Sequence, residues 1–156
     1  SQDIHVTVKE AKQYIEDYLN TYSGVNNYMK ESVEKAKNLG YVETMFHSPR
    51  ALPDINSKKP ALRGFSERVA MNMPIQGTAA DIIKLAMIKV YRRLKEENLR
   101  SRLILQVHDE LMVEAAEDEV QKVKEIVKYE MENAAKLSVK LEVDIHDGKN
   151  WYIAKG

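Results

Sequence analysis

The sequence has 156 residues, of which 44% are hydrophobic, and its 24 basic and 24 acidic side chains give a formal net charge of zero. That length suits one domain with a real core and is short for two. With 31% charged residues and no apolar run near the roughly 18 residues that a membrane span requires, a membrane-spanning protein is excluded. The absence of cysteine excludes disulfides and thiolate zinc sites and favours a reducing, cytoplasmic compartment.

The balanced total conceals a segregation of charge along the chain. Residues 50–68 carry five basic and two acidic side chains, residues 84–102 carry seven and two, and residues 109–132 carry three and nine. A nucleic-acid binder usually shows a basic excess, which the middle of the chain has and the whole chain lacks. Solvated helix faces of opposite sign explain the same pattern, so charge alone leaves both interpretations open.

The first forty residues are predicted to be helical. Apolar residues recur at helical spacing after Thr7, which is expected to cap the first helix, and Glu10 completes a capping box. Gly40 is expected to stop the second helix. Because these residues lack β-type patterning, they are expected to form a separate helical lobe. The predicted elements are helices over residues 7–22 and 25–39, a strand over 41–45 and a proline-containing loop over 48–60.

The rest of the chain alternates between helical and strand patterns. Pro74 is expected to end or kink a helix, because proline lacks the N–H that would bond to the carbonyl of Ala70. His108 and Asp109 separate two strand-like runs and predict a tight hairpin. The order of elements favours an α+β fold, with helices packed on a small antiparallel sheet. The predicted elements are helices over residues 62–73, 77–95 and 117–136 and strands over 102–107, 110–114 and 139–145.

Three consecutive polar residues, His108, Asp109 and Glu110, stand at the tip of the predicted hairpin. A tip made only for turning would more readily use Asn-Gly or Asp-Gly, since a type I′ turn needs positive φ at both central residues. Two carboxylates on a rigid support could instead hold a hard cation such as Mg²⁺. The alternative is an Asp favoured in a turn beside a Glu on a solvated strand end, and composition does not decide between the two.

A second group consists of Arg68, Asn72 and Gln76, which are four residues apart. If the helix continues past Pro74, these side chains share one face and offer donors suited to phosphates, sugars and minor-groove acceptors. The alternative is an ordinary polar helix face beside an apolar core stripe. Spacing alone does not exclude it.

Five ordered landmarks resemble family A of the DNA polymerases, the bacterial DNA polymerase I group. Gln106–Leu111 is similar to the third polymerase motif of that family, and Asn72–Ile83 resembles the segment that precedes it. The other three landmarks also have the family's order and spacing: Gly40–Thr44, Leu52–Ile55 and Gly148–Trp151. A lone His-Asp-Glu would be weak support, but five landmarks in order cover essentially the whole chain.

This resemblance implies the end of a fingers subdomain at residues 1–40 and most of a palm subdomain at residues 41–156. It implies a template-directed DNA polymerase of replication and repair, which transfers a nucleotide from a dNTP to the primer 3′-hydroxyl by a two-metal mechanism. Asp109 would be one of two aspartates that hold the two catalytic Mg²⁺ ions, with Glu110 beside it. The implied contacts with primer-template DNA are His108 by the primer terminus, together with Arg68, Asn72 and Gln76.

The chain also departs from the family pattern. Neither the motif with the second metal-binding Asp nor the helix with the nucleotide-binding Arg and Lys occurs in these 156 residues. The loop before Leu52 keeps one basic residue, Arg50, where many members carry a run of arginines. The chain alone is therefore expected to be inactive and to lack partners for part of its palm sheet, which leaves an edge for self-association. The alternatives are a non-catalytic DNA-binding module that uses the basic middle segment, and a structural domain whose tip is only a turn.

Overall fold

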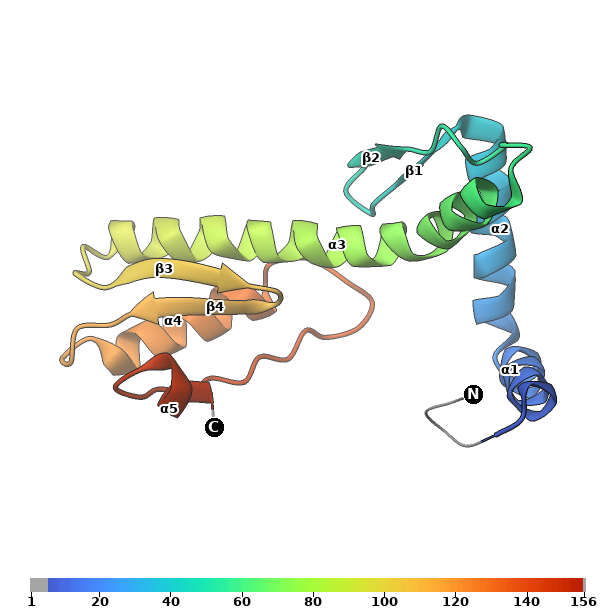
Figure 1. Ribbon diagram of the computed structural model, residues 1–156. Helices are drawn as coiled ribbons and strands as arrows, with labels where there is room; N and C mark the ends of the chain where they lie inside the picture. Colours follow the sequence, from blue (N-terminus) through green and yellow to red (C-terminus); the bar gives the residue numbers. More distant parts are fainter. Residues whose placement is uncertain (1–5, 156) are drawn as a thin grey trace. The chain divides into compact units, whose positions relative to one another are not determined.

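The computed structural model describes residues 6–155, which belong to two compact units, Ser1–Gly77 and Thr78–Gly156 (Figure 1). Helices and small antiparallel sheets occur in both, so the predicted α+β class is confirmed. None of the helices in the described part of the chain is long and apolar enough to cross a membrane. The elements are α1 (Val8–Thr21), α2 (Ser23–Leu39), β1 (Tyr41–Glu43), β2 (Pro49–Ala51), α3 (Pro60–Glu96), β3 (Arg102–Val107), β4 (Glu110–Glu114), α4 (Val120–Glu132) and α5 (Trp151–Lys155).

The two N-terminal helices begin and end where free backbone groups find partners. The Thr7 hydroxyl accepts a hydrogen bond from the Glu10 backbone N–H at 3.2 Å, and the Glu10 carboxylate accepts one from the Thr7 N–H at 2.8 Å. This is the predicted capping box. Gly40 has a φ of 78°, which glycine adopts without steric cost, and its N–H donates to the Ala36 carbonyl at 2.8 Å. The predicted stop of α2 at Gly40 is confirmed.

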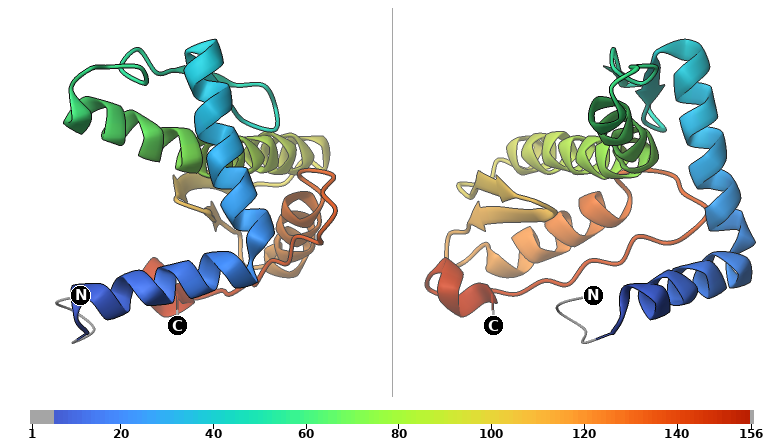
Figure 2. Two further views of the ribbon diagram at one scale, coloured as in Figure 1. Left: turned by 90° about the vertical axis from the view of Figure 1, so that its right-hand side faces the viewer. Right: turned by 45° about the vertical axis from the view of Figure 1, so that its right-hand side comes forward.

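Helix α1 buries none of its residues, although its apolar side chains follow helical spacing. Val8 is 76% exposed and Ile15 is 60% exposed. Figure 2 shows α1 at the far end of α2 from the β1–β2 hairpin, so the core of this unit lies elsewhere.

The segment predicted to be only a loop contains the strand β2, which pairs antiparallel with β1. Its proline, Pro49, is the first residue of the strand, a position where the missing N–H is tolerated. Strand β1 ends at Glu43 rather than at residue 45, because the Thr44 hydroxyl accepts hydrogen bonds from the N–H groups of Phe46 and Ser48 and closes a tight turn.

Helix α3 runs without interruption from Pro60 to Glu96, so the predicted division into two helices is wrong. Pro74 costs the helix interior about 3 kcal/mol. Ala70 is fully buried, and Val69 and Met73 pack against the same core. Burial of an apolar side chain contributes about 1.5–3 kcal/mol, so a few of them in the flanking turns offset the proline. The core of the first unit joins α2, β1 and α3 and consists of Ala36, Val42, Leu52, Ile55 and Ala70.

The second unit packs the β3–β4 hairpin and α4 against the C-terminal half of α3 (Figures 1 and 2). Both strands have the predicted bounds, and Val107 pairs with Glu110 on either side of a two-residue turn. The register shifts between Leu103 and Leu105, where Ile104 is an extra residue. The buried cluster is formed by Val90, Leu94, Val123, Ile126 and Val127, with Leu111 and Val113 of β4 packed against it.

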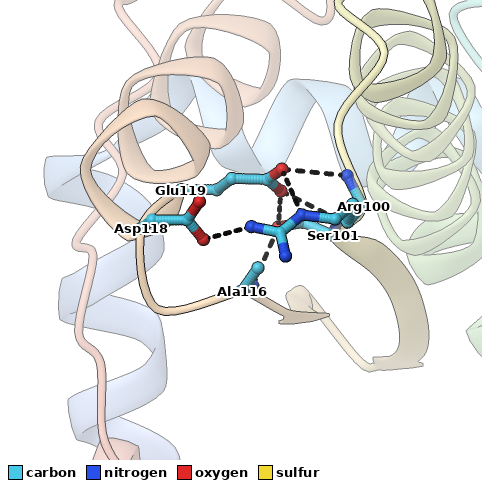
Figure 3. A network of polar contacts seen from close by, with 5 residues as sticks. All are labelled: Arg100, Ser101, Ala116, Asp118 and Glu119. Carbon is cyan, nitrogen blue, oxygen red and sulfur yellow. Dashed lines mark hydrogen bonds and ion pairs between the residues drawn. The ribbon is translucent and has the colours of Figure 1, made fainter.

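A polar network fixes the base of this hairpin (Figure 3). The Glu119 carboxylate accepts hydrogen bonds from the Ser101 hydroxyl at 2.6 Å, the Ser101 N–H at 3.0 Å and the Arg100 N–H at 3.1 Å. The Ser101 oxygen accepts from the Ala116 N–H at 3.1 Å, and Arg100 also pairs with Asp118. The network therefore joins the start of β3, the chain after β4 and the start of α4.

Two predictions for the last third of the chain are wrong in detail. Helix α4 begins at Val120, not at residue 117, because residues 117–119 form the turn before it and the Glu119 carboxylate binds Arg100 and Ser101 instead of capping the helix. It ends at Glu132, beyond which the Lys89 ammonium donates to the carbonyls of Asn133 and Ala134. Residues 139–145 form no strand, because a strand needs a hydrogen-bonded neighbour and no strand in the described residues pairs with them.

Two glycines of α3 should respond in opposite ways to alanine. A Cβ at Gly77 would lie 2.7 Å from the Cγ2 of the buried, branched Thr44, which cannot easily move. At Gly64 the nearest atom is the Arg68 guanidinium at 3.8 Å, an ordinary contact. We expect Gly77→Ala to lower the free energy of unfolding by about 1–3 kcal/mol and Gly64→Ala to raise it by about 0.5–1 kcal/mol, measured by urea denaturation. Stabilisation by both would show that Thr44 does not constrain α3.

The Glu119 network should make stability depend on pH. Hydrogen bonds from the Ser101 hydroxyl and the Arg100 N–H lower the pKa of Glu119 from 4.5 to about 2. Its contribution is therefore complete above pH 4.5 and is lost as the pH falls towards 2. In urea denaturation, Glu119→Gln should reduce the loss of unfolding free energy between pH 4.5 and 2. The control is Glu117→Gln, which should keep this loss, because Glu117 has no ion pair among residues 6–155. Equal profiles for the two variants would contradict the assignment.

Candidate active site

The hairpin tip consists of His108 and Asp109 between the paired residues Val107 and Glu110. His108 has a φ of 53°, and Asp109 is not among the described residues with positive φ. A positive φ at the first turn residue alone matches a type II′ turn, in which glycine is usual, rather than a type I′ turn. A side chain in this conformation costs about 1–3 kcal/mol. A turn that serves only to reverse the chain, the alternative left open by the sequence, would not require this strained histidine.

The strained turn is braced from within β3. The Gln106 side-chain amide donates a hydrogen bond to the His108 carbonyl. His108, Asp109 and Glu110 are all exposed, so both carboxylates are accessible from solvent. The predicted presentation of carboxylate oxygens at the end of a supported hairpin is what the structure shows.

One residue at this tip was not expected from the sequence. The Lys155 ammonium of α5 lies 3.7 Å from the Glu110 Oε1 atom and 6.0 Å from the centre of the Trp151 ring. Glu110 and Lys155 are far apart in the chain, so no local spacing rule could pair them. Asp109 has no ion pair within the described range 6–155.

The chemistry of Asp109 and Glu110 fits Mg²⁺, which prefers oxygen ligands and accepts a few carboxylates together with water and substrate phosphates. Residues 6–155 contain no group of three or more His, Asp or Glu residues that could hold a metal ion. These two carboxylates could therefore supply only part of a coordination shell.

The other predicted contacts lie in the first unit. Because α3 is continuous, Arg68, Asn72 and Gln76 share one helix face, and all three are exposed. The Arg68 guanidinium lies 6.0 Å from the ring centre of the exposed Phe65, a neighbour that the spacing of three residues could have indicated. Arg50 lies on β2, is exposed and has no ion pair in the described part of the chain. The exposure of this face fits both a DNA contact and an ordinary polar surface.

Part of the segregated charge is used inside the second unit. Arg100 of the basic stretch pairs with Asp118 and Glu119 of the acidic stretch, and Lys122 of the acidic stretch pairs with Glu97 of the basic one. Only the pairing of Arg100 reduces the basic excess of residues 84–102, because the Lys122–Glu97 pair neutralises an acidic side chain of that stretch. The stretch keeps exposed arginines without an ion pair in the described residues, Arg92 and Arg102, so its charge remains compatible with nucleic-acid binding.

Comparisons with known proteins agree over the whole chain. A model of DNA polymerase family A matches residues 1–153. The chain is 52% identical to the DNA polymerase I of Caldicellulosiruptor bescii and 50% identical to that of Geobacillus stearothermophilus, over 99% of this chain and 18% of each relative. It is similar, with a TM-score of 0.95 and 41% identity, to the solved POL domain of Pol1 from M. smegmatis in complex with DNA primer-template and dNTP, covering 99% of this chain and 27% of that one.

The chain thus spans about a fifth of the length of the curated relatives that it matches. The family match, the identity near one half and the structural similarity all cover the same residues as the five sequence landmarks. The resemblance stated from the sequence is confirmed, and the chain belongs to DNA polymerase family A.

Proposed function

We propose that this chain supplies part of the active site of a template-directed DNA polymerase, which joins a dNTP to a primer 3′-hydroxyl in DNA replication and repair. The observation that carries the proposal is the placement of Asp109 and Glu110, adjacent and exposed, at the braced tip of a hairpin in a family A chain. Primer-template DNA and dNTP are the proposed partners, and both are present in the M. smegmatis relative. We place residues 1–40 in the fingers and residues 41–156 in the palm, in a cytoplasmic enzyme.

Each residue at the tip has a proposed role. Asp109 and Glu110 would hold Mg²⁺ through their carboxylates, and His108 would contact the primer end. Two Mg²⁺ ions, when bound, would activate the attacking hydroxyl and stabilise the charge on the leaving pyrophosphate. The exposed turn gives these side chains access to a substrate, and the Gln106 hydrogen bond to the His108 carbonyl holds the turn.

The face formed by Arg68, Asn72 and Gln76 is proposed to contact the duplex. Arginine and amide side chains can donate to the minor-groove acceptors that all base pairs share. Such contacts bind correctly paired DNA regardless of its sequence. Arg50 on β2 would add a phosphate contact, because it is exposed and basic.

The proposed role of Asp109 can be tested in a chimera. This chain replaces the matching 155-residue stretch of the G. stearothermophilus polymerase, so that the missing motifs are restored. In primer extension, Asp109→Asn should lower kcat by about a thousandfold or more, because metal stabilisation of the transition state is worth several kcal/mol. Asp144→Asn, on an exposed aspartate of the same unit, should have little effect.

The chain without the rest of the polymerase should not extend a primer with Mg²⁺ and dNTPs. Robust extension by the purified chain would disprove the proposed inactivity, and an active Asp109→Asn chimera would disprove the metal role. The second outcome would favour the interpretation of the tip as only a turn.

A second function, DNA binding without catalysis, is favoured by the exposed face on α3. Arg68→Ala should weaken binding of the chain to primer-template duplex and reduce the slope of log affinity against log salt by about one, because one positive charge beside the DNA backbone is lost and one counterion fewer is released on binding. Fluorescence anisotropy at several salt concentrations measures both quantities.

The control for this titration is Arg92→Ala, on an exposed arginine of the same helix. Equal losses for the two variants would assign binding to total charge rather than to the Arg68 face, and no binding at low salt would exclude this function. Sedimentation of each sample checks for the proposed self-association, for which the exposed Ile104 and Leu105 of β3 offer an apolar edge.

A further inference from the structure

The C-terminal helix α5 reaches the tip of the β3–β4 hairpin. Its last residue, Lys155, places an ammonium 3.7 Å from the Glu110 Oε1 atom, and the Trp151 ring lies beneath the same ammonium at 6.0 Å. Both ends of the ion pair are partly exposed. An isolated pair of this kind contributes little to the stability of the fold. It does place a positive charge beside one of the two carboxylates at the tip.

The position of α5 is fixed by contacts within the second unit. Asn150 caps it, since the Asn150 side-chain oxygen accepts a hydrogen bond from the Ile153 N–H at 3.0 Å. Gly148 leaves room for the backbone of the helix, because a Cβ there would lie 2.8 Å from the Ala154 nitrogen. Asp147 pairs with Lys124 of α4. The Asp147–Lys124 pair thus ties the segment before α5 to a helix that packs on the hairpin.

The two adjacent carboxylates at the tip therefore differ. Glu110 has a cation beside it, whereas Asp109 has no ion pair in the described residues. Two unit charges about 4 Å apart interact by roughly 1 kcal/mol in water, which changes binding about fivefold. A divalent ion doubles this energy, whereas a greater distance from the ammonium and added salt reduce it. A cation that approaches the tip is repelled by the Lys155 ammonium beside Glu110. Asp109 has no paired cation in the described residues that would oppose binding in the same way.

We propose that Lys155 is a positioning residue that holds the Glu110 carboxylate and weakens divalent cation binding at the tip. This inference rests on the proposed metal role of the tip. It assigns the C-terminal helix a part in setting the metal affinity of the site, in addition to any structural role.

The test is a titration of the chain with Tb³⁺, an oxygen-seeking cation whose luminescence is sensitised by a nearby tryptophan, followed by displacement with Mg²⁺. Trp151 is the only tryptophan in the sequence and lies beside Lys155, so it reports on this site. Lys155→Met should lower the half-saturating concentration of Mg²⁺ by about two- to fivefold, and that of Tb³⁺ by more, because the repulsion grows with the charge of the ion. Lys155→Arg should restore the original value.

Two further variants separate the causes. Lys149→Met removes a charge from the same C-terminal segment, on an exposed lysine without an ion pair in the described residues, and should leave the midpoint unchanged. In a Glu110→Gln background, Lys155→Met should have a smaller effect, because the ammonium of Lys155 is then no longer held beside the tip by the Glu110 carboxylate. Circular dichroism confirms that each variant is folded.

Each outcome is decisive. An unchanged midpoint in Lys155→Met, when Asp109→Asn weakens binding, would overturn this inference and leave the proposed function intact. A midpoint that does not respond to Asp109→Asn would show that the ion binds elsewhere and would overturn both. An equal shift in Lys149→Met and Lys155→Met would reduce the effect to general charge and overturn the specific role of Lys155.

Discussion

The hydrogen-bonded carboxylate of Glu119 is the interaction on which the second unit depends. It joins the start of β3, through Arg100 and Ser101, to the first turn of α4, and the Ser101 hydroxyl continues the network to Ala116 after β4. A two-stranded hairpin is marginally stable by itself, so this hairpin needs support from outside its strands. The candidate ligands stand at the opposite end from the network. Their placement is therefore determined by polar contacts at the base and apolar packing of β4 on α3 and α4.

Charge in this chain serves two purposes that the sequence could not separate. Basic and acidic stretches that look like a DNA-binding face and a metal-binding face also bind each other, as Arg100 does with Asp118 and Lys122 with Glu97. Exposed arginines without an ion pair in the described residues include Arg50 and Arg68 in the first unit and Arg92 and Arg102 in the second. The zero net charge is a sum over basic and acidic stretches that are separated along the chain, so it does not count against nucleic-acid binding.

Local features were predictable from the sequence, and features that depend on distant residues were not. The capping box of Thr7 and Glu10, the stop at Gly40 and the hairpin around His108 each follow from a few neighbouring residues. The continuity of α3 through Pro74 depends on burial of its flanking turns, and the absence of a strand at residues 139–145 depends on the absence of a pairing strand in the described chain. The contact of Lys155 with Glu110 joins elements that no spacing pattern relates.

The physical cost of the hairpin tip favours the interpretation as a site over that as a turn. Glycine at position 108 would relieve a φ of 53°, and a neutral residue at position 109 or 110 would remove the repulsion between adjacent carboxylates. The chain instead keeps the strained His108 and both carboxylates. The Gln106 hydrogen bond stabilises the turn, and the Lys155 ammonium lies beside the Glu110 carboxylate. Local strain that is supported by the surrounding structure is characteristic of functional sites. A turn that only reversed the chain would need none of these contacts.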